Sequence, residues 1–93
     1  MRIIIKTMHY LVDITKLSTD EKNQMFDRLD GASFITLRYF ENSILKGFSV
    51  TWNSDPQIFM FIADSFPNSR YVDVTNWDLS NLNYAFWAAF ASD

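Results

Sequence analysis

The sequence predicts one α+β domain in which four strands and three helices follow one another in the order βαββαβα. Three observations support this: segments rich in β-branched and aromatic residues, helix starts marked by capping residues, and no repeat or Pro/Gly-rich linker within residues 1–93. This length suits a single core of packed layers. With 48% apolar and 17% aromatic residues, the chain can bury enough area to fold without cross-links.

The first strand and the first helix are expected within residues 2–31. Residues 2–14 are rich in β-branched side chains, which favours a strand. Ser18 and Glu21 then form a capping box, in which each side chain accepts a hydrogen bond from the backbone N–H of the other. Apolar residues recur behind this box at helical spacing: Met25, Phe26 and Leu29. Gly31 is expected to end the helix, because glycine readily adopts the left-handed backbone found after helix C-termini.

A hairpin is expected next. Residues 33–40 and 45–52 have strand composition and are separated by the polar turn 41–43. In the second strand the large apolar residues alternate with small or polar ones. These apolar residues are Phe48, Val50 and Trp52. Because side chains alternate between the two faces of a sheet, we expect this side of the strand to face the core.

The second helix is expected to start at Asp55 as N-cap, with Pro56 at the first helical position. Its buried stripe is predicted from the helical period and contains Ile58, Phe59, Ile62 and Phe66. Residues 67–69 should end this helix, and residues 71–75 should form a short fourth strand.

A final helix, capped by Asp78 or Ser80, is expected to run to about Ala91. The order βαββαβ is the one that a ferredoxin-like split βαβ plan requires, with an antiparallel sheet covered by two helices on one face. The additional C-terminal helix would then cover a sheet edge or lie on the open face.

This final helix is apolar on two sides. One stripe is an ordinary core face and contains Leu79, Leu82, Phe86, Ala89 and Phe90. The opposite side carries Tyr84, Trp87, Ala88 and Ala91. A helix without a polar face is either buried on both sides or docked against a second surface. The second stripe therefore predicts a homodimer seam or a partner site, unless Trp87 packs beneath the loop between the third strand and the second helix.

Charge is distributed unevenly along the chain. Residues 1–46 carry a balance of +1, whereas residues 47–93 carry −4 and also eleven of the sixteen aromatic residues. Nucleic-acid binders show the opposite sign, because phosphate neutralisation supplies much of their affinity. A basic protein partner is favoured instead, and we expect Asp73 and Asp78 to steer its association.

Several site types find no residues in the sequence. There are no cysteines, which excludes disulfides, thiolate chemistry and Cys-based zinc sites. His9 is the only histidine, so no catalytic triad or histidine metal site is predicted. No apolar run approaches the length of a membrane span and no signal-peptide cleavage pattern is present, so we expect a cytoplasmic protein.

The segment from Lys46 to Trp52 resembles the RNP1 motif of RNA-recognition domains, which share the βαββαβ order. The resemblance implies that the side chains of Phe48 and Val50 face RNA, although that family has aromatic residues at both positions. The first strand also has Ile4 where the companion motif of that family has an aromatic residue. RNA binding through Lys46 and Phe48 is kept as one alternative function.

The segment from Tyr10 to Ile14, followed by a helix and then by residues 39–41, resembles the small ferredoxin-like ribonucleases of CRISPR adaptation. In that family an aspartate ending the first strand binds a metal at a dimer seam. The resemblance implies a metal-dependent nuclease that uses Asp13 in a dimer. However, the basic residues with which that family holds nucleic acid are sparse in this chain, and an aspartate at a strand end also commonly forms a turn.

Residues 74–82 resemble the Trp-Asp-x-Ser-Asn-hydrophobic signature of bacterial surface leucine-rich-type repeats. Such repeats are stabilised by stacking in arrays. A single copy cannot form a solenoid, so we assign no function to this segment.

In its size, lack of cysteine, Asn/Ile/Phe-rich composition and acidic bias, the chain resembles small phage-encoded early proteins, among them anti-CRISPR and other anti-defence inhibitors. The resemblance implies a protein that binds a host machine and is not an enzyme. We therefore predict a protein-binding module that occludes a host nucleic-acid-handling complex, without cofactor or metal. Its predicted partner site consists of Asp73, Asp78, Tyr84, Trp87, Ala88 and Ala91.

Overall fold

The computed structural model describes residues 6–29 and 33–91, and within them the predicted order of elements is confirmed. The elements are β1 (Met8–Asp13), α1 (Thr19–Leu29), β2 (Ser33–Glu41), β3 (Ile44–Trp52), α2 (Pro56–Asp64), β4 (Arg70–Asp73), the short 3₁₀ helix η1 (Leu79–Asn81) and α3 (Leu82–Ala89). The predicted strand start at Arg2 and the predicted terminator Gly31 lie outside the described residues.

The C-terminal helical segment differs from the continuous helix that was expected. Asp78 caps η1, with its carboxylate accepting a hydrogen bond from the backbone N–H of Ser80 at 3.0 Å. Asn81 then caps α3 by accepting from the backbone N–H of Tyr84 at 3.2 Å. The expected cap at Asp78 is therefore confirmed for η1, whereas the expected single helix running to about Ala91 is corrected: a second capping side chain starts α3 after one tight turn, and α3 ends at Ala89.

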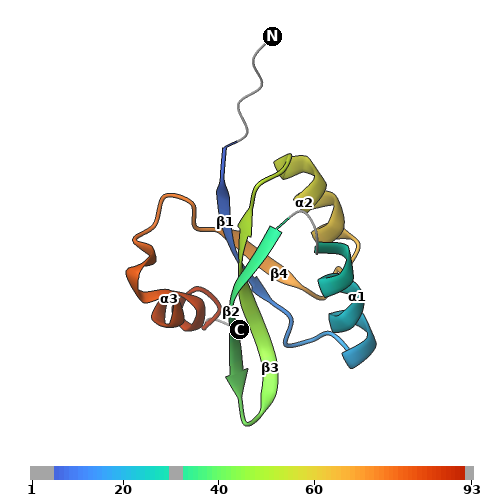
Figure 1. The fold of residues 1–93 in the computed structure, drawn as a ribbon. Coiled ribbons are helices and arrows are strands. Elements are labelled where there is room, and N and C mark those ends of the chain that lie inside the picture. The colour runs from blue at the N-terminus through green and yellow to red at the C-terminus, as the bar shows by residue number, and fades with distance from the viewer. Residues whose placement is uncertain (1–5, 30–32, 92–93) are drawn as a thin grey trace.

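The four strands form one antiparallel sheet in the order β2-β3-β1-β4. In the central strand β1, Val12 lies opposite Phe48 of β3 on one side and opposite Tyr71 of β4 on the other. Helices α1 and α2 cover one face of this sheet, and α3 lies on the other face (Figure 1). The predicted α+β class with an antiparallel sheet is thus confirmed, and the third helix occupies the open face.

The main core lies between the sheet and helices α1 and α2. Phe48, Val50 and Trp52 of β3 are all buried on this side, as the alternation predicted. The ring of Tyr10 stacks on Phe59 of α2, with a distance of 3.9 Å between ring centroids. A smaller second core lies beneath α3 and contains Leu11, Tyr39, Val74 and Phe86. Both faces of the sheet therefore have apolar layers that hold helices in place.

The predicted helix starts on the main-core side are confirmed. The backbone N–H of Ser18 donates to Glu21 at 2.9 Å, and the backbone N–H of Glu21 donates to the Ser18 hydroxyl at 3.2 Å. Asp55 is the N-cap of α2 and accepts from the backbone N–H of Gln57 at 2.9 Å, with Pro56 at the first position. These local contacts satisfy N–H groups that have no partner inside the helix.

The predicted buried stripe of α2 is wrong at one position. Phe59, Ile62 and Phe66 are buried as expected, but Ile58 is 47% exposed. Ala63 is buried in its place. At about 100° per residue, the buried residues span an arc of roughly 100°, and Ile58 lies about 90° from the centre of that arc. The helix is apolar enough to hide which of its sides faces the core.

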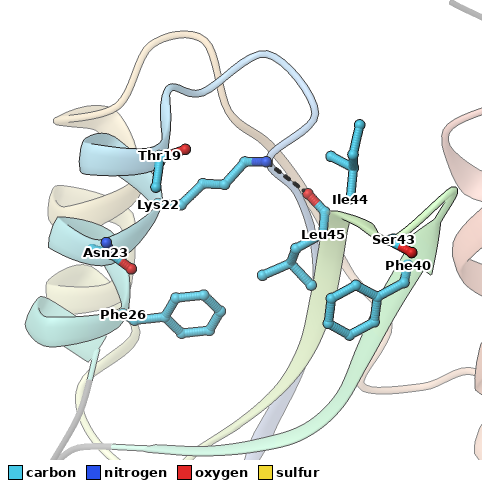
Figure 2. A pocket seen from close by; sticks show the side chains of 8 residues that line it. All are labelled: Thr19, Lys22, Asn23, Phe26, Phe40, Ser43, Ile44 and Leu45. Carbon is cyan, nitrogen blue, oxygen red and sulfur yellow. Dashed lines mark hydrogen bonds between the residues drawn. The ribbon is translucent and has the colours of Figure 1, made fainter.

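The β2–β3 hairpin extends beyond the rest of the sheet. The pairing between β1 and β3 ends with Asp13 opposite Gly47, whereas β2 and β3 remain paired as far as Glu41 and Ile44. The hairpin turns at Asn42 and Ser43, whose φ angles of 53° and 66° are those of a left-handed two-residue turn. A groove lies between this extension and α1 (Figure 2).

None of the helices in the described part of the chain is both long and apolar enough to cross a lipid bilayer.

Candidate protein-binding surface

The position of α3 on the sheet is set by its aromatic core residue. The ring of Phe86 stacks on Tyr39 of β2, with 4.4 Å between centroids and 9° between ring planes. Phe86 is 1% exposed, and the partly buried side chains of Leu82, Ala89 and Phe90 pack against the same cluster. The expected core stripe of this helix is confirmed at these four positions, while the side chain of Leu79 lies outside the described part. The opposite side of α3 is consequently turned away from the sheet.

We use the name outer surface of α3 for Tyr84, Trp87 and Ala88 of that helix together with Ala91 in the turn that follows it. Tyr84 is 71% exposed and Trp87 is 36% exposed, and both alanines are exposed as well. The indole Nε1–H of Trp87 donates to Asn83 at 3.0 Å, and its ring contacts Phe86 edge-on at 4.9 Å. Trp87 is thus held by its own helix. The alternative position beneath the loop between β3 and α2 does not occur, because α3 lies over the Gly47 end of β3 and that loop follows the Trp52 end.

The two predicted steering carboxylates lie in different places. Asp78 is fully exposed at the start of η1, and its hydrogen bonds with Ser80 lower the pKa of its carboxyl group. Asp73 is also exposed, and it accepts from the backbone N–H of Thr75 at 2.9 Å. Because Asp73 lies opposite Tyr10 in the sheet, its side chain belongs to the face covered by α1 and α2. Asp78 is therefore next to the helical segment that carries the outer surface of α3. The side chain of Asp73 lies on the opposite face of the sheet.

Two further exposed apolar residues lie before the helical segment and on the sheet face that carries α3, and the sequence analysis singled out neither of them. Trp77 directly precedes Asp78 and is 45% exposed. Leu37 of β2 is 46% exposed and has the same strand parity as Tyr39, so it lies on the face of the sheet that carries α3. Neither residue belongs to a helical stripe. In the sequence, the one indication that Trp77 is exposed is its position directly before Asp78, the acidic N-cap of η1.

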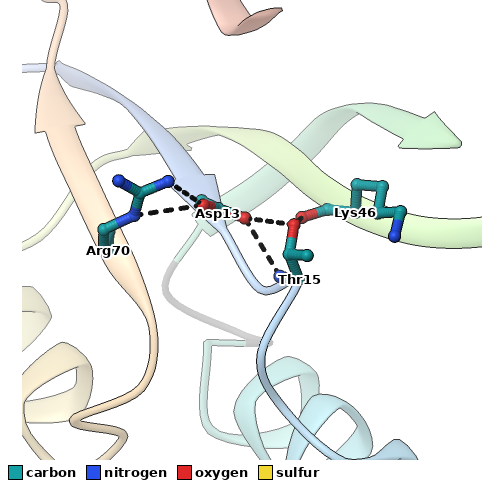
Figure 3. Close-up of polar contacts among 4 residues, drawn as sticks. All are labelled: Asp13, Thr15, Lys46 and Arg70. Carbon is teal, nitrogen blue, oxygen red and sulfur yellow. Dashed lines mark hydrogen bonds and ion pairs between the residues drawn. The ribbon is translucent and has the colours of Figure 1, made fainter. Parts of the chain in front are cut away.

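Asp13, the candidate metal ligand, is engaged in polar contacts within the fold (Figure 3). One carboxylate oxygen accepts from the backbone N–H and the hydroxyl of Thr15, at 3.0 and 2.6 Å. The other accepts from Nε and Nη2 of Arg70, at 3.1 and 2.5 Å. Burial acts to raise the pKa of Asp13, but the hydrogen bonds from Thr15 and Arg70 outweigh it, and the pKa is lowered. Asp13 thus forms the turn after β1 and links it to β4.

The candidate RNA-binding pair is not arranged for base stacking. Phe48 is fully buried, and its ring lies 4.9 Å from that of Phe26 on α1. Lys46 is partly buried, and its carbonyl oxygen accepts from the backbone N–H of Ile14 at 2.8 Å. A base cannot reach the ring of Phe48 without displacing α1, so the alternative RNA site is not supported at this residue.

His9 lies on the face of the sheet that carries α3. Its Nδ1 lies 3.4 Å from the hydroxyl of Thr51, and its backbone N–H donates to Thr75 at 3.0 Å. The described residues contain no cluster of three or more His, Cys, Asp or Glu side chains placed to hold a metal ion.

Comparisons of the chain with protein-family models, with curated proteins and with solved structures gave no match.

Proposed function

We propose that this protein is a non-enzymatic binding module that presents the outer surface of α3 to another protein. The observation that carries the proposal is the exposure of Tyr84 and Trp87 on the side of α3 that faces away from its core contacts. Tyrosine and tryptophan are the residue types that most often contribute strongly to binding at protein interfaces. The hydrogen bond from Trp87 to Asn83 fixes the indole before binding, which reduces the entropy lost on association.

The spacing on this helix suits a protein partner. Positions 84, 87 and 88 lie within α3 and follow the i, i+3, i+4 spacing by which a helix contacts another helix or an apolar groove, and Ala91 lies in the turn just beyond the end of the helix. Residues 79–91 contain no charged side chain, so docking requires no desolvation of a charge on the helix itself. The two exposed alanines have small side chains, so a partner can approach the backbone closely next to the aromatic residues.

Charge favours a basic partner. Asp78 lies one residue before the helical segment and is fully exposed, so its carboxyl group is ionised at neutral pH as exposed carboxyl groups are. With a net charge of −4 on residues 47–93, this half of the chain attracts a positively charged surface at long range. Asp73 adds to this field from the other face of the sheet. Occlusion of a basic groove on a host nucleic-acid-handling complex, the mode of action of a phage anti-defence inhibitor, is the form of this function that we propose.

We assign the fold to the ferredoxin-like plan. The strand order β2-β3-β1-β4 supports this assignment, since each split βαβ unit then has a third strand between its two parallel strands. In this assignment α3 is an addition that occupies the sheet face otherwise left open. A function based on α3 therefore fits this chain better than a function based on the sheet surface.

The test compares three forms of the protein: wild type, the double variant Tyr84→Ser/Trp87→Ser, and the control Phe61→Ser, which removes a 69% exposed aromatic ring from α2. Each is used as bait in host lysate, and any captured protein is then purified and titrated. The proposal predicts a basic partner that binds wild type and control, loses at least tenfold in affinity for the double variant, and binds more weakly as salt is raised.

Light scattering after size exclusion supplies the opposing outcome. A wild-type dimer that dissociates in Trp87→Ala would show that the outer surface of α3 joins two copies of the chain. That result would overturn the proposal of a separate basic partner.

A further inference from the structure

We infer that the groove between α1 and the β2–β3 hairpin is a second binding site, which takes an acidic peptide segment carrying one large apolar side chain. This site is separate from the outer surface of α3, because α1 and α3 lie on opposite faces of the sheet (Figure 1). The groove has a volume of about 370 Å³, within the range of sites that accept a ligand or a few side chains.

The walls of the groove are apolar and come from both elements. Phe26 of α1 and Phe40 of β2 point toward each other across Leu45, as Figure 2 shows. Phe40 is 57% exposed and Ile44 is 51% exposed, and both lie on the paired strands of the hairpin. Large apolar side chains held this close together in contact with water form a patch that gains free energy when a partner covers it.

The shape of the groove follows from the hairpin. Since β1 ends its pairing at Gly47, the strands beyond this point are supported by α1 rather than by a third strand. The ammonium group of Lys22 donates to the carbonyl oxygen of Leu45 at 2.9 Å and ties α1 to the hairpin. The groove is therefore formed before any ligand binds, and binding does not require the hairpin to move.

The charge of the groove indicates the chemistry of the ligand. Lys22 is the one charged residue among the eight that line it. An ammonium group has three N–H donors, and Leu45 accepts from one of them, so a ligand carboxylate can approach the others. Arg38 adds a second positive charge nearby, with its guanidinium 5.3 Å from the centroid of the Phe26 ring. The amide of Asn23 can both donate to and accept from a peptide backbone.

These features together favour a peptide in which an aromatic or leucine side chain enters between Phe26 and Phe40 and an adjacent carboxylate meets Lys22. A basic segment would bring like charges together at Lys22 and Arg38, which costs free energy. The groove and the outer surface of α3 thus select partners of opposite charge.

The test uses a fluorescein-labelled peptide of the sequence Glu-Asp-Ser-Phe-Glu-Ser-Asp, and a second peptide with lysine in place of every acidic residue. We expect the acidic peptide to bind the full chain with an affinity on the order of 10–100 μM, and the basic peptide to bind at least tenfold more weakly. Fluorescence anisotropy gives the affinities, and amide chemical shifts in two-dimensional NMR locate the bound peptide.

Variants separate this site from other apolar surfaces. Phe40→Ser should weaken binding of the acidic peptide about tenfold, and Lys22→Gln about fivefold. Phe61→Ser is the matched control, because it removes a ring of similar exposure from α2, and the double variant Tyr84→Ser/Trp87→Ser should also leave peptide binding unchanged. All these positions except Lys22 are at least one-third exposed, so each variant is expected to fold, which circular dichroism checks.

Three results would overturn the inference: no binding of the acidic peptide at 1 mM (roughly the weakest affinity that the anisotropy assay resolves), equal binding of both peptides, or equal loss in Phe40→Ser and Phe61→Ser. Failure of the peptide to bind leaves the proposed function of α3 untouched, since the bait experiment concerns different residues.

Discussion

The ring of Phe86 on α3 lies directly against Gly47 of β3. A Cβ atom added at Gly47 would fall well inside contact distance of that ring and of the carbonyl oxygen of Val12. Phe86 also stacks on Tyr39 of the neighbouring strand. Because Gly47 has no side chain, there is room for the Phe86 ring to pack directly on the sheet. Because Phe86 packs against Gly47 and Tyr39, that side of α3 faces the sheet and the outer surface of α3 faces away from it.

We expect Gly47→Ala to destabilise the fold by about 2–3 kcal/mol, as overpacking of a well-filled core does. The added methyl group overlaps both the ring of Phe86 and the carbonyl oxygen of Val12, so that ring and β1 must both shift. Urea unfolding followed by circular dichroism measures the free energy of unfolding. Combining the change with Phe86→Leu should relieve part of the clash. The double variant should therefore lose less free energy of unfolding than the two single variants lose together. Strict additivity would mean that the ring of Phe86 and Gly47 do not meet.

Asp13 is expected to make stability depend on pH in the acid range. Its pKa is lowered in the folded protein, so its contribution is present above the unfolded value of about 4 and is lost as pH falls through the folded value. Asp13→Asn should cost about 2 kcal/mol at pH 7, since the charge that pairs with the partly exposed Arg70 is removed. Unfolding at a series of pH values from 6 to 2 checks this. The variant should show a shallower loss of stability below pH 4 than wild type, and parallel curves would contradict the assignment.

The capping box gives a third prediction. Ser18→Ala should cost about 1 kcal/mol, because the backbone N–H of Glu21 loses its acceptor at the start of α1. Thr19→Ala is the neighbouring control, and it should change stability by less than about 0.5 kcal/mol because Thr19 is exposed. Thermal unfolding gives the melting temperature of each variant. A larger decrease for Thr19→Ala than for Ser18→Ala would contradict the role of Ser18 as the cap of α1.

The features that the sequence predicted correctly are those in which neighbouring residues decide the outcome. Ser18 and Glu21 are three positions apart, Asp55 and Pro56 are adjacent, and the alternation around Phe48 extends over a few residues. Each of these depends on contacts within one turn or one strand, where residue type and spacing are sufficient.

The features that it did not predict depend on contacts between distant parts of the chain. Asp13 and Arg70 are 57 positions apart, so nothing near Asp13 indicates that its carboxylate has a cationic partner. The groove beside Phe40 exists because the β2–β3 hairpin extends beyond the end of β1. How far each strand stays paired depends on the whole sheet and cannot be predicted from one segment. Ile58 was predicted to be buried and is exposed, whereas Ala63 is buried. The prediction failed because the sequence of a helix that is apolar on several sides does not show which side faces the core.

The orientation of α2 gives the last prediction, and it rests on two phenylalanines two positions apart. Phe59 is fully buried between Tyr10 and Trp52, whereas Phe61 is 69% exposed on the other side of the helix. Phe59→Ala should cost about 3–5 kcal/mol, because it leaves a cavity in the main core. Phe61→Ser should stay within about 1 kcal/mol of wild type, with the contact between its ring and Arg28 as the main loss. Urea unfolding of both variants decides the matter, and comparable losses would mean that α2 is rotated from the orientation described.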